Sequence, residues 1–170
     1  QTCALPIYTW VINATDAGTL NGIEFTGMPN LTGGTDDDTF TFEDLGLLNG
    51  AVDGGGDGTN GDTIIGDNDG NAFGIDAANG GTLTGKTSGF SNVENLTGGG
   101  LGVTLAFDTD GALPGAVDGG GDGANGDTLI RDDGGNAFVI DALNGGPPTA
   151  TSSPPRPAHN PTRHAHRPPP

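Results

Sequence analysis

Short runs that alternate apolar and polar residues recur along residues 8–146, separated by Gly, Asn and Asp. Phe40 and Phe42 lie two residues apart, which places both rings on one face of a strand, with Thr39 and Thr41 on the other. Glycine recurs too often for a long helix, and no stretch shows an apolar stripe with a period of 3.6 residues. The pattern predicts strands of four to six residues joined by tight turns, in the runs NLTGG, DTFTF, GAVDGG, GDTIIGD, NAFGID and GGTLTG.

The chain contains a long internal repeat. Residues 51–81 align without gaps to residues 116–146 and differ at 7 of 31 positions, which sets the period at 65. A partial earlier copy is present as well, since residues 10–20 match residues 73–83 at an offset of 63. A fixed period of this kind indicates units that complete their buried surface against their neighbours.

Apolar anchors divide each repeat into three parts. Leu31, Val52, Phe73 and Leu96 follow one another at spacings of 21, 21 and 23, which together make one period of 65. This spacing predicts three rungs per repeat, each with two short strands, stacked at the usual strand separation of about 4.8 Å. The predicted fold class is therefore all-β, a parallel β-solenoid (β-helix or β-roll) of about six rungs of roughly 21 residues around a thin apolar axis.

The two ends of the sequence differ from its body. Residues 1–7, QTCALPI, match an in-frame translation of the end of a common sequencing adapter, so we interpret them as foreign to the natural protein. Residues 147–170 contain no acid and no glycine but nine prolines, which predicts a disordered tail. This tail is explained either by a shift of reading frame or by a native proline-rich linker. The solenoid prediction applies to residues 8–146.

The charge is strongly one-sided. The chain has 22 Asp and Glu against 5 Lys and Arg, a formal net charge of −17, and within residues 8–146 only Lys86 and Arg131 are basic. Such a body repels phosphate backbones and anionic lipid, so we expect neither nucleic-acid binding nor membrane insertion. The apolar runs are also far shorter than the roughly 20 residues that cross a bilayer. No basic segment followed by an apolar one marks the N-terminus as a secretion signal.

Three segments carry a family resemblance: GFSNVENLTGGG (89–100), NLTGGTDDDTFTF (30–42) and GAVDGG (50–55). They resemble repeat regions of very large bacterial secreted exoproteins and filamentous-haemagglutinin-like adhesins. The resemblance covers residues 8–146. It implies a right-handed parallel β-solenoid at the bacterial cell surface or outside the cell, with a structural or adhesive role. The expected partner is an unknown host or cell-surface ligand, either a glycan or a protein.

A second similarity is to the calcium-binding nonapeptide of RTX proteins, G-G-x-G-x-D-x-U-x, in which aspartate and glycine carbonyls hold calcium between turns. The match is partial, because the copies here are separated by the rung spacing rather than placed in tandem. The alternative function is therefore a calcium-dependent RTX-like β-roll of a secreted protein. The candidate calcium ligands are the acids retained in both repeats and two earlier ones: Asp57, Asp62, Asp122, Asp127, Asp36 and Asp38.

The electrostatics of stacked rungs leave two interpretations of these acids open. Carboxylates about 5 Å apart repel each other by about 1 kcal/mol in water and about 3 kcal/mol at an effective dielectric constant of 20. Bound calcium would offset that repulsion. Alternatively the side chains point into solvent, where salt screens them.

The sequence offers few residues for other kinds of metal site or for catalysis. Asp67, Asp69 and Asn71 form the D-x-D-x-N start of an EF-hand loop, but Ala78 stands where the loop needs Glu, so we interpret the segment as a turn. Residues 8–146 contain no His and no Cys, which excludes nucleophile–base triads. We therefore expect no enzyme, with a glycoside-cleaving pair of aspartates as the least favoured interpretation. Open strand edges at the ends of the stack also predict end-to-end self-association.

Overall fold

The computed structural model describes residues 7–132 with the exception of 57, 122 and 125. These residues all belong to one compact unit of the chain, Gln1–Asn136. They form strands and loops without a helix, which confirms the all-β prediction, and none of them forms a helix suited to crossing a membrane. Our interpretations of the adapter-like start, apart from Ile7, and of the proline-rich tail lie outside the described residues.

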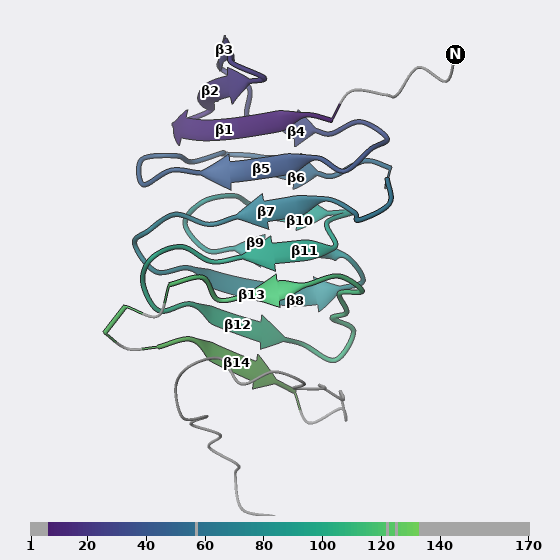
Figure 1. Ribbon diagram of the computed structural model, residues 1–170, viewed down its shortest axis with the longest axis vertical. Helices are drawn as coiled ribbons and strands as arrows, with labels where there is room; N and C mark the ends of the chain where they lie inside the picture. Colours follow the sequence, from purple (N-terminus) through teal and green to yellow (C-terminus); the bar gives the residue numbers. More distant parts are fainter. Residues whose placement is uncertain (1–6, 57, 122, 125, 133–170) are drawn as a thin grey trace, which may run out of the picture. The chain divides into compact units, whose positions relative to one another are not determined.

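The strands form two sheets of seven strands each (Figure 1). The first sheet contains β1 (Thr9–Ala14), β2 (Ala17–Leu20), β3 (Ile23–Thr26), β5 (Thr39–Phe42), β7 (Thr63–Ile65), β11 (Asn95–Thr97) and β13 (Val117–Asp118). The second sheet contains β4 (Leu31–Thr32), β6 (Ala51–Asp53), β8 (Ala72–Ala77), β9 (Gly80–Leu83), β10 (Gly89–Ser91), β12 (Thr104–Phe107) and β14 (Thr128–Arg131).

The order of the first sheet is β13-β11-β7-β5-β1-β2-β3, and that of the second is β14-β12-β8-β9-β10-β6-β4. Eight neighbouring pairs are parallel and four are antiparallel. The antiparallel pairs belong to two three-stranded meanders, β1-β2-β3 and β8-β9-β10, which stand at equivalent places in the two repeats. Between the meanders the chain passes from one sheet to the other at each strand.

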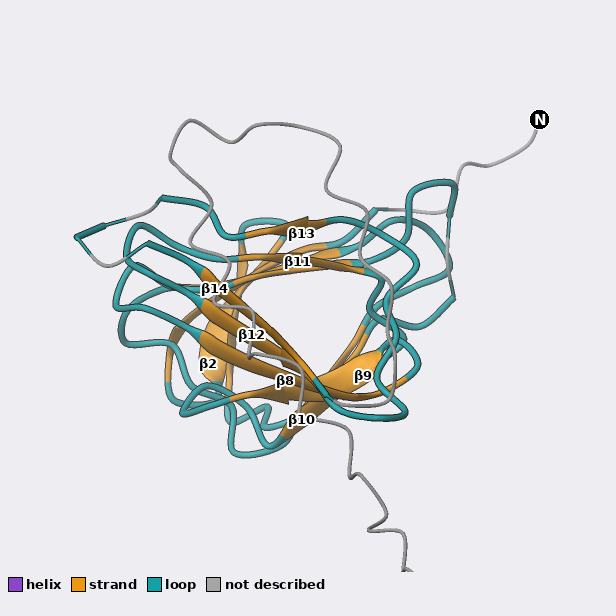
Figure 2. Ribbon diagram, turned by 90° about the horizontal axis from the view of Figure 1, so that it is seen from below, coloured by secondary structure: helices purple, strands orange, loops and turns teal. Residues whose placement is uncertain are grey.

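The core lies between the two sheets, which Figure 2 shows on opposite sides of a shared interior. Phe40 and Phe42 are buried, while Thr39 and Thr41 are only partly so, as the alternation predicts. In-register pairing aligns buried side chains of successive strands into rows, for example Phe40 opposite Ile64. Since each row removes apolar surface from water only when its neighbours are in place, stacking and burial depend on each other.

The predicted order of the anchors is correct only in its first step. Leu31 pairs with Val52 in the second sheet, but β9 and β10 separate Val52 from Phe73, and Leu96 lies in the first sheet. The reason is the meander, whose three strands remain in one sheet instead of alternating. The chain therefore does not return to the same place at every anchor.

Each repeat supplies seven strands, β1 to β7 and β8 to β14. Because seven is odd and the meander occupies one sheet, the second repeat begins in the sheet opposite to the first: β1 lies in the first sheet and β8 in the second. The two repeats together give seven strands in each sheet, where the sequence predicted about six rungs.

The two repeats use the same hydrogen bonds. The Asn30 side-chain oxygen accepts the Ala51 N–H at 2.9 Å, and one period later Asn95 accepts the Ala116 N–H at 2.8 Å. The same is true of a tight turn, in which Asp53 and Asp118 each accept the N–H two residues ahead. The sequence repeat is therefore also a repeat of contacts.

Candidate functional site

Four acids that immediately precede strands accept hydrogen bonds from backbone amides. We call them the corner acids: Asp38 before β5, Asp62 before β7, Glu94 before β11 and Asp127 before β14. Glu94 accepts the N–H of Asp62 at 2.9 Å, and Asp62 accepts the N–H of Asp38 at 2.7 Å. Asp38 in turn accepts the N–H of Tyr8, which precedes β1, at 2.6 Å. Each of these three carboxylates thus accepts the N–H of the residue that precedes the neighbouring strand of the first sheet.

The second sheet repeats this bond with one change. Asp127 accepts the N–H of Val103 at 2.9 Å, which corresponds to the bond between Asp62 and Asp38 in the first repeat. Val103 occupies the place of Asp38 and is fully buried. The Asp38 carboxylate, which accepts the Tyr8 N–H, therefore has no counterpart in the second repeat.

Glycines face the corner acids because no side chain fits beside them. A Cβ at Gly33 would collide first with the Gly54 carbonyl oxygen and also with the Asp38 carboxylate, and one at Gly54 would collide first with the Asn92 carbonyl oxygen and also with the Asp62 carboxylate. The Gly34 N–H also donates to Asp38. Close approach of the backbone and of the corner acids together therefore requires glycine at these two positions.

Of the six predicted calcium ligands, the four that the structure describes do not belong to its one converging group of three acids. Three of them, Asp38, Asp62 and Asp127, lie at separate corners with an oxygen already bonded to a backbone amide. Asp36 is partly exposed in the loop before β5. Calcium binding at the six predicted positions remains a prediction, and two of them lie outside the described residues: Asp57 and Asp122.

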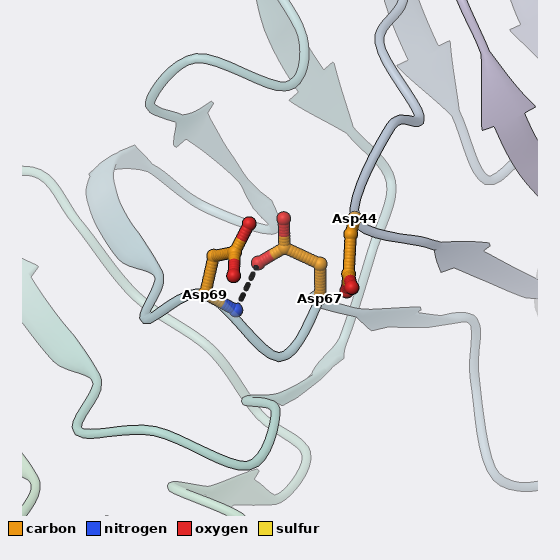
Figure 3. A group of neighbouring side chains, drawn as sticks. All are labelled: Asp44, Asp67 and Asp69. Carbon is orange, nitrogen blue, oxygen red and sulfur yellow. Dashed lines mark hydrogen bonds between the residues drawn. The ribbon is translucent and has the colours of Figure 1, made fainter.

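Within the described part of the chain, one group of three acids converges, and we call it the aspartate cluster. It consists of Asp44 in the loop after β5 with Asp67 and Asp69 in the loop after β7, and their nearest oxygens lie within 4.8 Å of one another (Figure 3). Asp67 is buried, whereas Asp44 and Asp69 are exposed. Asp44 and Asp67 also line an open pocket of about 700 Å³ together with the glycines 98–100. Carboxylate oxygens in such a group are ligands that calcium prefers.

A lysine already neutralises part of this cluster. Lys86, in the loop between β9 and β10, forms an ion pair with the buried carboxylate of Asp67, and the Lys86 side chain is only 14% exposed. Its ammonium group also donates to the main-chain carbonyl of Asp44 at 2.8 Å. The cluster therefore combines three carboxylates with one internal cation, and any metal ion would compete with this ammonium group.

The loop of Asp67 to Asn71 is a turn, as the sequence predicted. The Asp69 N–H donates to Asp67 Oδ1 at 3.1 Å, and the Asn71 side chain donates to the Asp67 carbonyl at 2.7 Å. Sequence reasoning missed the partners of this turn, Asp44 and Lys86. The separation of Asp44 from Asp67 is close to the predicted rung spacing, and Lys86 is the only lysine in the chain, so both signals were present.

Asp37 accepts hydrogen bonds from the loop that precedes β7. It accepts the Asn60 N–H at 2.9 Å and the Gly61 N–H at 3.0 Å. The backbone hydrogen bond from Asn60 is the main reason that the pKa of Asp37 lies below the ordinary 3.8. Because the folded pKa is lowered, this contact stabilises the fold above the ordinary pKa and is lost as the pH falls through the folded pKa.

No family model, no curated protein and no solved structure matches this chain.

We predict that replacing a corner acid destabilises the fold through the amide that it leaves behind. Asp62→Ala removes the acceptor of the buried Asp38 N–H, so the free energy of unfolding should fall by about 1–3 kcal/mol. Urea unfolding followed by circular dichroism measures the change. Asp76→Ala, on the exposed face of β8, is the control and should change stability by less than about 0.5 kcal/mol. Equal losses for the two variants, or a loss for Asp62→Ala that disappears in chelator, would contradict a backbone role.

We also predict that Lys86→Met is destabilising by about 3 kcal/mol, since it leaves the Asp67 carboxylate buried without its cation. The double variant Lys86→Met with Asp67→Asn should recover part of that loss, because no charge then remains buried. Thermal and urea unfolding of the two variants and of Asp67→Asn alone complete the cycle. Strictly additive effects would show that the ion pair contributes no coupling.

Proposed function

We propose that residues 8–146 are part of a parallel β-solenoid that serves as a structural or adhesive repeat segment of a large bacterial extracellular or cell-surface protein. In this role the chain is not an enzyme. It holds a regular surface at a fixed spacing, and that surface contacts a host or cell-surface glycan or protein.

The observation that carries this proposal is the recurrence of the same contacts one period later. The hydrogen bond between Asn30 and Ala51 has a counterpart between Asn95 and Ala116 at a closely similar distance. The bond from the Asp38 N–H to Asp62 likewise has a counterpart from the Val103 N–H to Asp127. Eight of the twelve strand pairs are parallel, and the chain mostly alternates between the two sheets. A protein extended by adding such units gains length without a new fold, which is what a scaffold requires.

The use of the acids supports a non-catalytic role. The corner acids accept backbone amides, and the aspartate cluster holds the ammonium group of Lys86. A general acid or nucleophile needs a carboxylate that is free to reach a substrate. The sequence of residues 8–146 also offers no His or Cys as an alternative.

One observation favours the alternative of a calcium-dependent β-roll, namely the convergence of Asp44, Asp67 and Asp69. If calcium drives folding, the circular dichroism spectrum of the full chain should be that of a β protein in calcium and that of an unfolded chain in EDTA. If the scaffold needs no metal, the two spectra should be the same. We expect the second result, because Lys86 already supplies a positive charge to the cluster.

We predict that an inserted repeat lengthens the protein by a fixed step. A second copy of residues 51–115, inserted between Gly115 and Ala116 of the full chain, adds seven strands shared by two sheets and should add roughly 17 Å to the maximum dimension. Small-angle X-ray scattering measures this, and a variant with two inserted copies is the control, for which the step should double. Growth in all directions instead of one would refute the solenoid, and glycoside turnover that Asp44→Asn abolishes would refute the non-catalytic role.

A further inference from the structure

The contact between Lys86 and Asp67 joins two parts of the molecule that are distant in the architecture. Asp67 follows β7, the last strand of the first repeat, in the first sheet. Lys86 lies between β9 and β10 of the second repeat, in the second sheet. The Asp67 side chain is 1% exposed and that of Lys86 is 14% exposed. The one lysine of a strongly acidic chain is thus turned inward and held against a buried carboxylate.

Lys86 is fixed at both ends of its side chain. At the main chain, its N–H donates to the Leu83 carbonyl at 3.1 Å, and its carbonyl accepts the Leu48 N–H at 2.7 Å. At the other end, the ammonium group donates to the main-chain carbonyl of Asp44 at 2.8 Å. The freedom that a flexible amine must lose before it reacts has therefore been lost already in the fold.

The Asp67 carboxylate is fixed as well. Its Oδ1 accepts the Asp69 N–H at 3.1 Å, the bond drawn in Figure 3, and the Asp67 N–H donates to the Asn71 side chain at 3.3 Å. The other oxygen, Oδ2, is the one in contact with the Lys86 ammonium group. An amine and a carboxyl group are thus held together by contacts that do not depend on their mutual attraction.

We propose that Lys86 and Asp67 condense to form an intramolecular amide, an isopeptide bond. A bond forms between Lys86 Nζ and Asp67 Cγ, and the bond between Cγ and one carboxylate oxygen breaks. Two of the three protons on Nζ leave with that oxygen as water, and the third stays on the amide nitrogen. An ammonium group and a carboxylate thus become a neutral amide and water, with no oxidant and no further reactant.

The surroundings favour this reaction in two ways. Two opposite charges held away from water are costly to bury, and the amide replaces both of them with a neutral group. The carboxylates of Asp44 and Asp69, with oxygens within 4.8 Å of that of Asp67, carry protons from Nζ to the leaving oxygen, directly or through one water. The ion pair described above is the state before condensation.

The bond would tie the first repeat to the second and one sheet to the other. It closes a loop of the chain between residues 67 and 86, and like a disulfide it restricts the unfolded chain. Residues 8–146 contain no cysteine, so a disulfide cannot serve this purpose there. The proposal fits a scaffold but does not depend on an adhesive role, since a chain that binds no glycan or protein could still form the bond.

The test uses the full chain and two measurements under denaturing conditions. The intact mass should be lower by one water than the mass calculated from the sequence. A lysine-specific protease has one site in this chain, after Lys86, and cuts an unreacted chain into residues 1–86 and 87–170. The cross-linked chain should resist this cut. Water lost at another place, such as a succinimide at an Asp-Gly pair, would leave Lys86 cleavable and would overturn the proposal.

Four variants complete the test. Lys86→Arg keeps a cation that forms no amide and should have its full calculated mass, while Asp67→Ala leaves the amine free and should be cut completely. Asp76→Ala, on the exposed face of β8, is the matched control and should stay cross-linked. Asp44→Asn combined with Asp69→Asn removes the proton carriers, so the cross-link should form at least about tenfold more slowly in samples taken during expression.

Two results would contradict the proposal. An original chain of full calculated mass that is cut completely after Lys86 would show that the contact is an ion pair only. A water loss that persists in Lys86→Arg would show that it arises at another residue. Both readouts are taken on denatured chains, and the first needs no variant, so a variant that fails to fold does not affect it.

Discussion

The structure depends on how the backbone amides at the strand starts are satisfied. Where the chain turns from one sheet to the other, the N–H of the residue before a strand lies in the interior, away from water, and leaving it unpaired costs about 1–3 kcal/mol. The carboxylate of the next strand's corner acid accepts it, from Glu94 to Asp62 and from Asp62 to Asp38. A residue before one strand thus completes the hydrogen bonding at the start of the neighbouring strand, in addition to the strand ladder itself. This arrangement couples neighbouring strands, because removing one exposes both apolar surface and a buried amide of the other.

The sequence is sufficient to predict the elements and insufficient to predict how they connect. The alternation of Phe40 and Phe42 with threonines identifies β5 and its buried face, and the constant offset between the two repeats identifies which segments are equivalent. The sequence does not reveal the meander. The apolar and polar residues around Phe73 alternate in the same way whether the next strand crosses to the other sheet or turns back beside β8. The turn at Asn79, with a left-handed φ of 54°, makes β9 antiparallel to β8. The turn places β9 and β10 between β8 and β6 in the second sheet, so Phe73 does not lie next to Val52.

The same limit applies to the acids. Repetition correctly marks Asp62 and Asp127 as equivalent, and both make the same bond. Repetition does not distinguish an acid kept for a ligand from one kept for a backbone amide, since either is retained in both copies. The aspartate cluster shows the reverse case. Thr109 and Gly134 stand where Asp44 and Asp69 would recur, so the cluster is confined to one repeat and self-comparison passes over it.

The negative charge opposes the pairing that exposed apolar side chains on the outer described strands favour, among them Ile23, Val117 and Leu129. Stacked sheets with exposed final strands tend to pair with any other strand, and a large net charge of one sign is a general protection against such pairing. At physiological ionic strength, charges farther apart than about 8 Å are largely screened, so this protection acts mainly at short range and weakens as the salt concentration rises. Register is fixed by the pleat: a shift of one residue would turn the side chains that now pair in the core, such as Phe90 opposite Val52 and Leu96 opposite Ile64, to the outer face of the sheet.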